Sequence, residues 1–417
     1  MTSAQQQETT EPAQTTEDTH HEVIIVGAGL SGIAAAASLR ENGIDDFLII
    51  ERRSGIGGTW HQNTYPGCEC DVPSHLYSYE WAPNPDWSRL FAPQDEIRRY
   101  IEDVAAKHGV TRRIRFDTTL ESARWDEEGQ RWEIATDRGS LTCHHLISAV
   151  GSIQEPNVDA IKGLKDFKGR TFHSSAWPDG YTGAGERVAV IGTGASSIQI
   201  TPSLQPHVEH LTVFQRTPSW INPKPNPRIP KMVRRLFRQV PLTYRIMRGA
   251  LLMGAESVVL SLSHPWMARL FSIPTRLYLR SAVKDPELRR VLTPDYLLGC
   301  KRALISSKFY PALQQPNVRL VPRAVARVDA TGVIDVDGEH HEVDTIVVAT
   351  GFHFGNATIS DRVIGRAGKT LDELWDGVPS AYRGTIVSGF PNFALLWGPN
   401  SGTGSAFAIA EAQMTYV

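Results

Sequence analysis

Two glycine-rich loops are the parts of this chain whose residue types best suit chemistry on a dinucleotide. The first reads Gly-Ala-Gly-Leu-Ser-Gly and the second Gly-Thr-Gly-Ala-Ser-Ser. A G-x-G-x-x-G loop between a strand and a helix directs backbone N–H groups and the helix N-terminus at a pyrophosphate. A serine in the third position is still small enough for the helix to approach the strand. The residues expected to bind the two pyrophosphates are Gly27, Gly29, Gly32, Gly192, Gly194, Ser196 and Ser197.

The residue that ends the next strand distinguishes the two loops. Glu51 follows the first loop at about 20 residues, the usual distance of a carboxylate that accepts hydrogen bonds from a ribose with a free 2′-hydroxyl. The second unit has Gln215, Arg216 and Thr217 at this place. Arginine can bind a 2′-phosphate through two hydrogen bonds, whereas a carboxylate would repel it. The alternatives are a structural glycine turn and a surface arginine at a strand end.

The two loops together predict a pair of cofactors that exchange a hydride. A first site for a ribose with a free 2′-hydroxyl and a second site for NADP are typical of hydride transfer from NADPH to FAD. The residues of the two loops are typical of either a flavin reductase or a monooxygenase and do not decide between them.

Buried apolar runs frame both loops and predict a strand–loop–helix–strand unit at each. The expected strands are residues 23–26, 47–50, 125–133, 140–150, 187–191, 211–214 and 345–349. We therefore expect an α/β protein with two Rossmann-like dinucleotide-binding domains, the NADP domain being inserted into the FAD domain. The expected bounds are residues 21–155 and 330–417 for the FAD domain and residues 156–329 for the NADP domain.

Two segments differ from this pattern. Residues 1–20 are polar and lack an apolar core, so we expect a disordered tail. Residues from about 225 to 297 begin in a proline-rich linker and predict a helical insertion that carries Arg234, Arg235, Arg238, Arg245 and Arg248. These arginines suit either an amphipathic membrane surface or a helical cap with a solvated basic face. Gly249, Gly254 and Pro265 should interrupt a long amphipathic helix and therefore favour the cap.

The composition of the chain excludes several other classes of function. The net charge of -2 over 417 residues gives no field that would attract nucleic acid. Four cysteines without a secretory leader indicate a reducing compartment, and we expect a cytoplasmic protein. Cys68 and Cys70 lack a second pair at ligand spacing, so no metal site is expected. No apolar stretch has the length that a membrane span requires.

A twelve-residue segment between the two loops narrows the function by resemblance. Its sequence, Phe-Lys-Gly-Arg-Thr-Phe-His-Ser-Ser-Ala-Trp-Pro, resembles the F-x-G-x-x-x-H-x-x-x-W-P fingerprint of the type I Baeyer–Villiger monooxygenases. The matching residues are Phe167, Gly169, His173, Trp177 and Pro178. The simpler interpretation of His173 alone is a linker histidine whose hydrogen bonds are satisfied.

The resemblance to this family extends over most of the chain and implies roles for further residues. It places Gly58, Thr59, Trp60, Asp71, Tyr77 and Asn400 beside the flavin. It places Lys301 with Arg216 and Thr217 at the 2′-phosphate, and it makes Asp71 and Arg302 the active-site pair. The implied reaction inserts one oxygen atom of O2 next to a ketone carbonyl through a C4a-peroxyflavin. An arginine beside the peroxide suits this chemistry, because its fixed charge favours the anion.

The chain departs from the family pattern at two places. Ala149-Val150-Gly151 stands where the family has Ala-Thr-Gly, and family members continue well beyond the equivalent of Val417. We therefore expect either a shortened member or a fragment.

Three rival functions remain at this point. They are another class B flavin monooxygenase that oxidises nitrogen or sulfur, an oxygen-inert NADPH-dependent flavoprotein, and a disulfide reductase. The last would need a C-x-x-C or C-x4-C pair near the first loop, which Cys68 and Cys70 do not provide.

Overall fold

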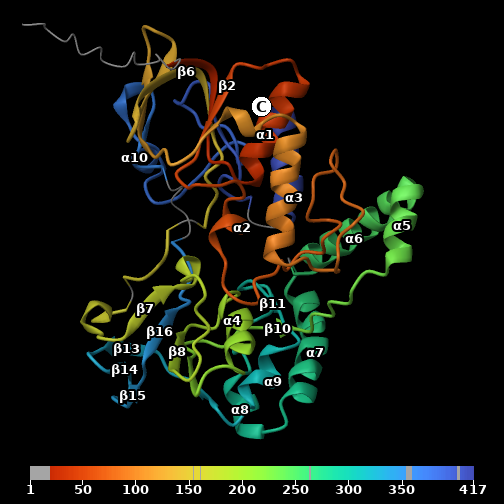
Figure 1. Ribbon diagram of the computed structural model, residues 1–417, viewed down its shortest axis with the longest axis vertical. Helices are drawn as coiled ribbons and strands as arrows, with labels where there is room; N and C mark the ends of the chain where they lie inside the picture. Colours follow the sequence, from red (N-terminus) through yellow and green to blue (C-terminus); the bar gives the residue numbers. More distant parts are fainter. Residues whose placement is uncertain (1–18, 154, 160, 263, 354–358, 402–403) are drawn as a thin grey trace, which may run out of the picture.

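The computed structural model describes residues 19–417 except 154, 160, 263, 354–358 and 402–403. The described chain forms two lobes, each built around its own sheet (Figure 1). The tail expected over residues 1–20 lies mainly outside the described residues, but its last residue, His20, already belongs to the first strand.

The upper lobe in Figure 1 contains the first glycine loop and a mixed sheet with the strand order β17-β4-β5-β6-β1-β2-β3. Strand β18 also pairs with β6. Strands β1, β2 and β3 run parallel, whereas β4, β5 and β6 form an antiparallel meander. The strands are β1 (His20–Val26), β2 (Phe47–Ile50), β3 (Ile114–Arg115), β4 (Leu120–Asp126), β5 (Arg131–Thr136), β6 (Gly139–Ser148), β17 (Val363–Ile364) and β18 (Phe393–Leu395).

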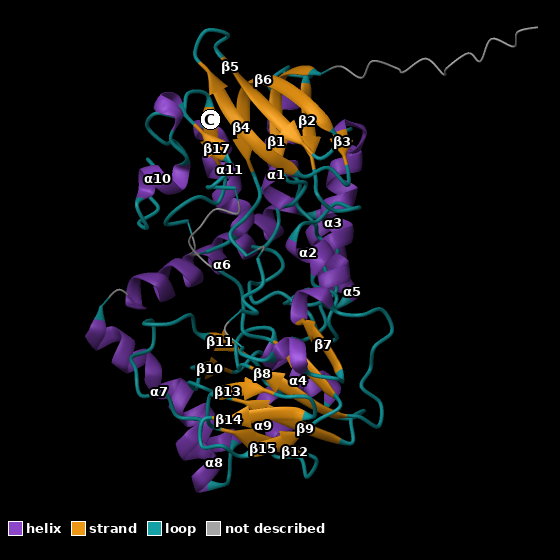
Figure 2. Ribbon diagram, turned by 90° about the vertical axis from the view of Figure 1, so that its left-hand side faces the viewer, coloured by secondary structure: helices purple, strands orange, loops and turns teal. Residues whose placement is uncertain are grey.

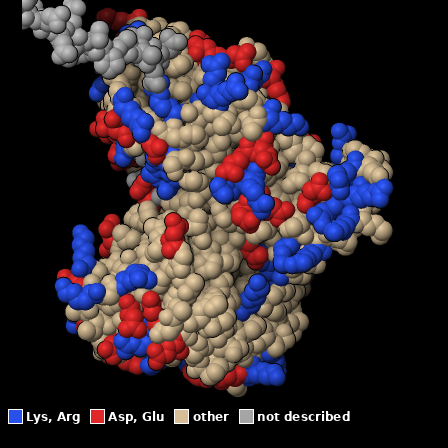
Figure 3. All heavy atoms as spheres, in the orientation of Figure 1, with Lys and Arg blue, Asp and Glu red and all other residues tan. Residues whose placement is uncertain are grey.

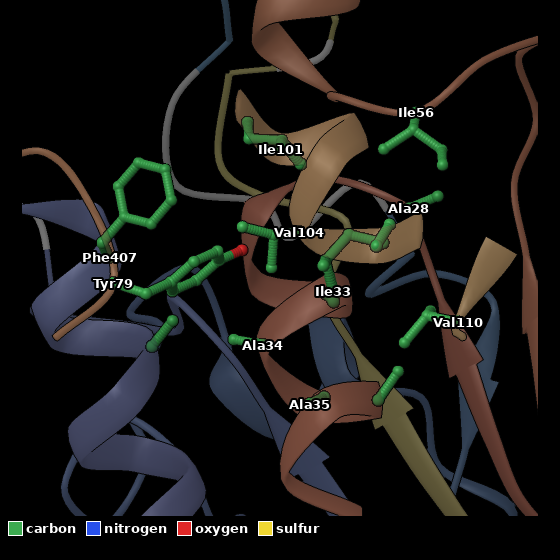
Figure 4. Packing of buried hydrophobic residues seen from close by; sticks show 14 of the residues in the cluster. Ala28, Ile33, Ala34, Ala35, Ile56, Tyr79, Ile101, Val104, Val110 and Phe407 are labelled. Atoms are coloured by element: carbon green, nitrogen blue, oxygen red, sulfur yellow. The ribbon is translucent and has the colours of Figure 1, made fainter. Parts of the chain in front are cut away.

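Helices cover one face of this sheet and join distant parts of the sequence. Figure 4 shows Tyr79 between the first helix and the last, and its ring meets the ring of Phe407, which belongs to the last helix, edge to face with centroids 4.5 Å apart. The Tyr79 hydroxyl donates a hydrogen bond to the carbonyl oxygen of Leu30 at 2.5 Å. The helices of this lobe are α1 (Leu30–Glu41), α2 (Thr59–Gln62), α3 (Gln94–Lys107), α10 (Leu371–Trp375) and α11 (Ala406–Tyr416).

The lower lobe contains the second glycine loop and a parallel sheet of order β12-β9-β8-β16-β7. An antiparallel sheet of order β13-β14-β15 lies beside it (Figure 2). The elements are β7 (Arg170–His173), β8 (Arg187–Ile191), α4 (Ser197–Leu204), β9 (His210–Phe214), β10 (Ile221–Asn222), β11 (Leu304–Ile305), α9 (Phe309–Leu313), β12 (Val318–Val321), β13 (Val325–Val328), β14 (Gly332–Asp335), β15 (His340–Glu342) and β16 (Thr345–Val348).

Strand pairing corrects two of the expected segments. Strand β16 pairs with β8 and β7, so the expected return to the first domain at residue 330 is wrong, and the chain rejoins the first sheet only with β17. The expected strand over residues 125–133 is also wrong. It spans the turn between β4 and β5, whose residues Trp125 and Trp132 face each other across the hairpin.

The helical insertion comprises α5 (Lys231–Gln239), α6 (Pro241–Leu262), α7 (Pro265–Ala282) and α8 (Pro286–Val291). Helix α6 runs through Gly249 and Gly254, so these glycines do not interrupt it as expected. Lys and Arg side chains gather over α5 (Figure 3). Many outward-facing side chains of α6 and α7 are instead apolar, for example Ile246, Met253, Leu260, Trp266 and Leu277.

Within the described residues, no single helix is long and apolar enough to span a membrane. Segments Pro241–Leu260 and Pro265–Ala282 meet the length and composition requirements only together, and they are bent by 117°.

Side chains of α6 dock the insertion on the upper lobe. Arg248 is turned inward, against the expectation of a fully solvated basic face, and donates to the carbonyl oxygens of His75 and Ser78 at 2.9 and 3.0 Å. The Tyr244 hydroxyl lies 3.2 Å from that of Ser78. The ring of His75 is buried beneath these contacts, 5.4 Å from the ring of Tyr244 and 5.1 Å from that of Phe237.

This junction should make the fold sensitive to acid. Burial lowers the pKa of His75 to about 4, whereas the unfolded chain takes up the proton near its usual value of 6.5. The stability that the neutral imidazole contributes is therefore present above pH 6.5 and lost as the pH falls towards 4. When the pH falls from 7 to 4.5, the free energy of unfolding should therefore drop by about 2 kcal/mol less in His75→Phe than in the wild type. Chemical denaturation at both pH values measures the difference, and equal losses in the two proteins would contradict the assignment.

Candidate active site

A cavity of about 870 Å³ lies where the two lobes meet, and both glycine loops line it. Most of the residues predicted from the sequence to bind a cofactor or act on a substrate share this cavity. The predicted residues that line it are Gly27, Gly29, Glu51, Gly58, Thr59, Trp60, Asp71, Tyr77, Gly192, Gly194, Ser196, Arg216, Thr217, Lys301 and Arg302.

The Glu51 carboxylate holds the first glycine loop against the end of strand β2. This carboxylate is 6% exposed and accepts hydrogen bonds from the backbone N–H groups of Ala28 at 2.7 Å and Arg53 at 2.9 Å. The acid at the end of β2 is thus held against the loop, at the cavity wall. Gly32 does not line the cavity, but a methyl group there would collide with the carbonyl oxygen of Gly27, so the third glycine allows helix α1 to approach the loop.

The segment after Glu51 covers the first loop. Gly58 has φ +56°, and a methyl group on it would lie 3.0 Å from the Cα of Gly29. Trp60, in the short helix α2, donates a hydrogen bond to the Tyr77 hydroxyl at 3.1 Å. The rings of these two residues meet edge to face, with centroids 5.6 Å apart. Glycine at position 58 therefore permits close contact between two loops on the same side of the cavity.

The two glycines of the second loop have different surroundings: Gly192 is packed against the backbone, whereas Gly194 faces open space. Gly192 has φ +112°, and a methyl group on it would lie 2.5 Å from the carbonyl oxygen of Ala349 in the turn after β16. A methyl group on Gly194 would meet no described heavy atom within 4 Å. Ser197 is fully buried at the start of α4 and does not line the cavity. The open side of Gly194 leaves the space that the close approach of a pyrophosphate would need.

Cationic side chains lie beside the second loop. Arg216 and Lys301 are both exposed at the cavity, and the Lys301 ammonium lies 4.7 Å from the centre of the Tyr296 ring. The Thr193 hydroxyl donates to the carbonyl oxygen of Thr217 at 3.4 Å, which links the loop to the segment after β9. The residues at this end of the cavity therefore suit a nucleotide that carries a 2′-phosphate.

Asp71 and Arg302 both line the cavity, and no ion pair joins the two side chains in the described part of the chain. Among the described residues, the ion-pair partner of Asp71 is Lys224, at 3.2 Å. Burial raises the pKa of Asp71, and the positive charges of Lys224 and then Arg302 oppose this effect. Sequence reasoning missed Lys224, because a lysine in the proline-rich linker carries no motif.

The fingerprint segment does not line the cavity, and its side chains pack within the lower lobe. His173 ends β7, accepts a hydrogen bond from the backbone N–H of Ser175 at 3.1 Å, and lies with Nε2 3.1 Å from the carbonyl oxygen of Gly351. Trp177 packs edge to face on Phe172 at 5.0 Å. Phe167 lies in a buried cluster, and a methyl group on Gly169 would collide with the carbonyl oxygen of Asp344. Pro178 follows Trp177 at the end of the segment.

The last predicted residue, Asn400, is exposed with φ +65° and does not line the cavity. Part of its loop, residues 402–403, lies outside the described residues. Other residues line the cavity that sequence reasoning did not predict, among them Arg53, Gln199, Trp397 and Ala406. Gln199 lies in α4, so the start of the helix after the second glycine loop would have indicated it, whereas Ala406 begins α11 and follows neither loop.

The cysteines near the first loop are not suited to redox chemistry. Cys68 and Cys70 are free, and burial raises the pKa of each thiol to about 12. A thiol with so high a pKa carries almost no thiolate at neutral pH and is a poor nucleophile. The site therefore lacks the chemistry of a disulfide reductase.

Comparison with known proteins agrees with this geometry. The family model described as pyridine nucleotide-disulphide oxidoreductase matches residues 24–246. A Baeyer–Villiger monooxygenase of Streptomyces coelicolor is 46% identical over 95% of this chain and 77% of its own length. The structure superposes on closed cyclohexanone monooxygenase with a TM-score of 0.85 at 30% identity, covering 96% of this chain and 83% of that one. It also superposes on OTEMO in complex with FAD and NADP, with a TM-score of 0.85 at 30% identity over 96% and 85% of the two chains. The chain therefore belongs to the family of the Baeyer–Villiger monooxygenases.

Proposed function

We propose that this protein converts a ketone, O2, NADPH and a proton into an ester or lactone, NADP+ and water, with FAD as its cofactor. The observation that carries this proposal is a single cavity in which both glycine loops meet Asp71 and Arg302. Relatives named for this reaction and a structural neighbour in complex with FAD and NADP support it.

The residues of the upper lobe would hold FAD and those of the lower lobe NADPH. Glu51, at the end of β2, would accept hydrogen bonds from the hydroxyl groups of the FAD ribose. The loop from Gly27 to Gly32 would bind the pyrophosphate. Gly194 leaves room for the pyrophosphate of NADPH, and Arg216 and Lys301 suit its 2′-phosphate. When bound, FAD supplies the transfer of electrons from NADPH to O2.

Arg302 would provide the fixed positive charge that the oxygen insertion requires. An arginine stays protonated at any working pH, and its guanidinium stabilises negative charge that develops on a carbonyl oxygen. The guanidinium is exposed at the cavity and also acts electrostatically on Asp71, Cys70 and Tyr77.

Cofactor content and product analysis test this proposal. The purified protein should be yellow, and NADPH should bleach the flavin at least about tenfold faster than NADH, because Arg216 favours the 2′-phosphate. With NADPH and air, cyclohexanone should yield its lactone. A protein that cannot bind added FAD would refute the cofactor assignment.

Product analysis over ketones, sulfides and amines separates the related functions. Oxidation of sulfides or amines with no ester from any ketone would indicate another class of flavin monooxygenase. A flavin that stays reduced in air would indicate an oxygen-inert flavoprotein, whereas peroxide release as the sole outcome of NADPH oxidation would indicate a flavoprotein that reduces O2 without oxygenating a substrate.

A further inference from the structure

A buried lysine that does not itself line the cavity lies between two carboxylates of one loop, the loop that carries Glu69 and Asp71. The side chain of Lys224 is 3% exposed, and its ammonium lies 2.9 Å from Glu69 and 3.2 Å from Asp71. The ammonium also lies 5.1 Å from the centre of the Phe91 ring. A buried ammonium is costly unless anionic partners surround it, so this arrangement is held together by charge.

The lysine comes from the linker that leaves the lower lobe, whereas both carboxylates belong to the upper lobe. Its backbone N–H donates to the Ser307 hydroxyl at 2.9 Å, just beyond β11, which pairs with β10. Two residues on, Asn226 donates to Glu69 at 3.0 Å. The loop that carries Asp71 is therefore tied at several points to the linker.

Helix α4 holds the same loop from the second glycine motif. The Gln199 side chain donates to the carbonyl oxygen of Glu69 at 3.0 Å and lies within 3.3 Å of its backbone N–H, which donates in return. The Tyr65 hydroxyl also donates to Gln199, at 3.2 Å. Asp71 thus follows a loop segment, Tyr65–Glu69, whose two ends are both hydrogen-bonded to Gln199 in helix α4.

We propose that Lys224 is the positioning residue for Asp71 and leaves the guanidinium of Arg302 free to face the cavity. In this arrangement the linker, rather than Arg302, fixes the carboxylate at the junction of the lobes. The catalytic consequence of this inference rests on the proposed function of Asp71 and Arg302, whereas the anchoring itself does not.

The charges around Asp71 make this role measurable. The groups that face it are Lys224, Arg302, Glu69, Tyr65, Cys68 and Cys70. Burial raises the pKa of Asp71, and Lys224 is the strongest opposing charge. Loss of the ammonium should therefore raise this pKa further, so that the carboxylate becomes neutral at a higher pH.

The variant Lys224→Met tests the catalytic consequence, with Lys231→Met as its control at the exposed start of α5. We expect flavin content and the rate of reduction by NADPH to stay within twofold of wild type in both variants. In Lys224→Met alone, ester formed per NADPH should fall about tenfold, and the acid limb of its pH profile should move up by about one pH unit. Lys224→Arg, which keeps the charge, should restore the position of that limb.

Thermal unfolding tests the anchoring without any turnover. In Lys224→Met the pKa of Asp71 lies still further above its usual value of 3.8, so stability is lost as the pH rises from that value through the raised pKa, and the gap in melting temperature to the wild type should widen over this pH range. Adding Asp71→Asn should remove most of the pH-dependent part of this gap, while the lost ion pair with Glu69 leaves a part that does not depend on Asp71. A gap that is independent of pH, or unchanged by Asp71→Asn, would overturn the anchoring.

The two experiments separate failure of this inference from failure of the proposed function. A wild-type protein that forms no ester refutes the proposed function, while the melting series still decides whether Lys224 anchors Asp71. A wild-type protein that forms ester, together with a Lys224→Met variant of unchanged coupling and pH profile, refutes the positioning role. Equal losses of flavin, reduction and ester in Lys224→Met would show a merely structural lysine and would also refute it.

Discussion

Arg302→Ala should lower ester formation at least about a hundredfold while flavin reduction by NADPH stays within about threefold of wild type. The reason is that reduction needs only the two cofactors to meet, whereas oxygen insertion develops negative charge beside the substrate carbonyl. Arg302 is an exposed cation of the cavity wall, and Asp71 is already paired with Lys224, so the guanidinium is available for that charge. Removing a single preorganised donor from such a site usually costs two to three orders of magnitude in rate.

The adjacent cation provides a matched control for this experiment. Lys301 also lines the cavity, but its ammonium lies over the Tyr296 ring, whose hydroxyl donates to the carbonyl oxygen of Pro218, the residue after Thr217. Lys301→Ala should therefore raise the KM for NADPH several-fold and leave the ester formed per NADPH unchanged. Stopped-flow absorbance of the flavin and chromatography of the product measure both quantities. Similar effects of the two substitutions on coupling, or an Arg302→Ala variant that still forms ester at the wild-type rate, would argue against the assigned role.

The nucleotide-binding units could be predicted from the sequence because local signals agree there. Apolar runs mark β1 and β8, glycines follow each directly, and Glu51 and Arg216 end the next strands. Each of these features can be recognised from residues that are close together in the sequence. The structure confirms the α/β fold, and 46% identity to a Baeyer–Villiger monooxygenase confirms the family that the fingerprint indicated.

The features that could not be predicted depend on contacts between distant segments. Strand β16 is buried and apolar, as expected, but its sequence does not reveal which sheet it joins, and pairing with β8 places it in the lower lobe. Lys224 takes its role from Glu69 and Asp71, more than 150 positions away, and no local pattern marks it. The fingerprint histidine was recognised correctly as a family feature, yet its ring does not line the cavity and lies against the carbonyl oxygen of Gly351, which does.

A pair of glycine substitutions in the second loop should separate binding of NADPH from folding. Gly194→Ala should preserve the fold and the FAD content but raise the KM for NADPH at least about tenfold, a loss near 1.4 kcal/mol of binding. The added methyl group would meet no described atom within 4 Å and would project into the space that a pyrophosphate must approach. Backbone N–H groups bind phosphate at close range, so even one methyl group at this point displaces the ligand.

Gly192→Ala is the matched comparison, two residues away. Here the backbone has φ +112°, which L residues rarely adopt, and the methyl group would lie 2.5 Å from the carbonyl oxygen of Ala349. We expect this variant to lose roughly 2 kcal/mol or more of stability, because a strained backbone and a steric clash add. Thermal unfolding and titration with NADPH distinguish the two variants. If Gly194→Ala melted as early as Gly192→Ala, or bound NADPH like the wild type, the open side of Gly194 would not be the pyrophosphate cradle.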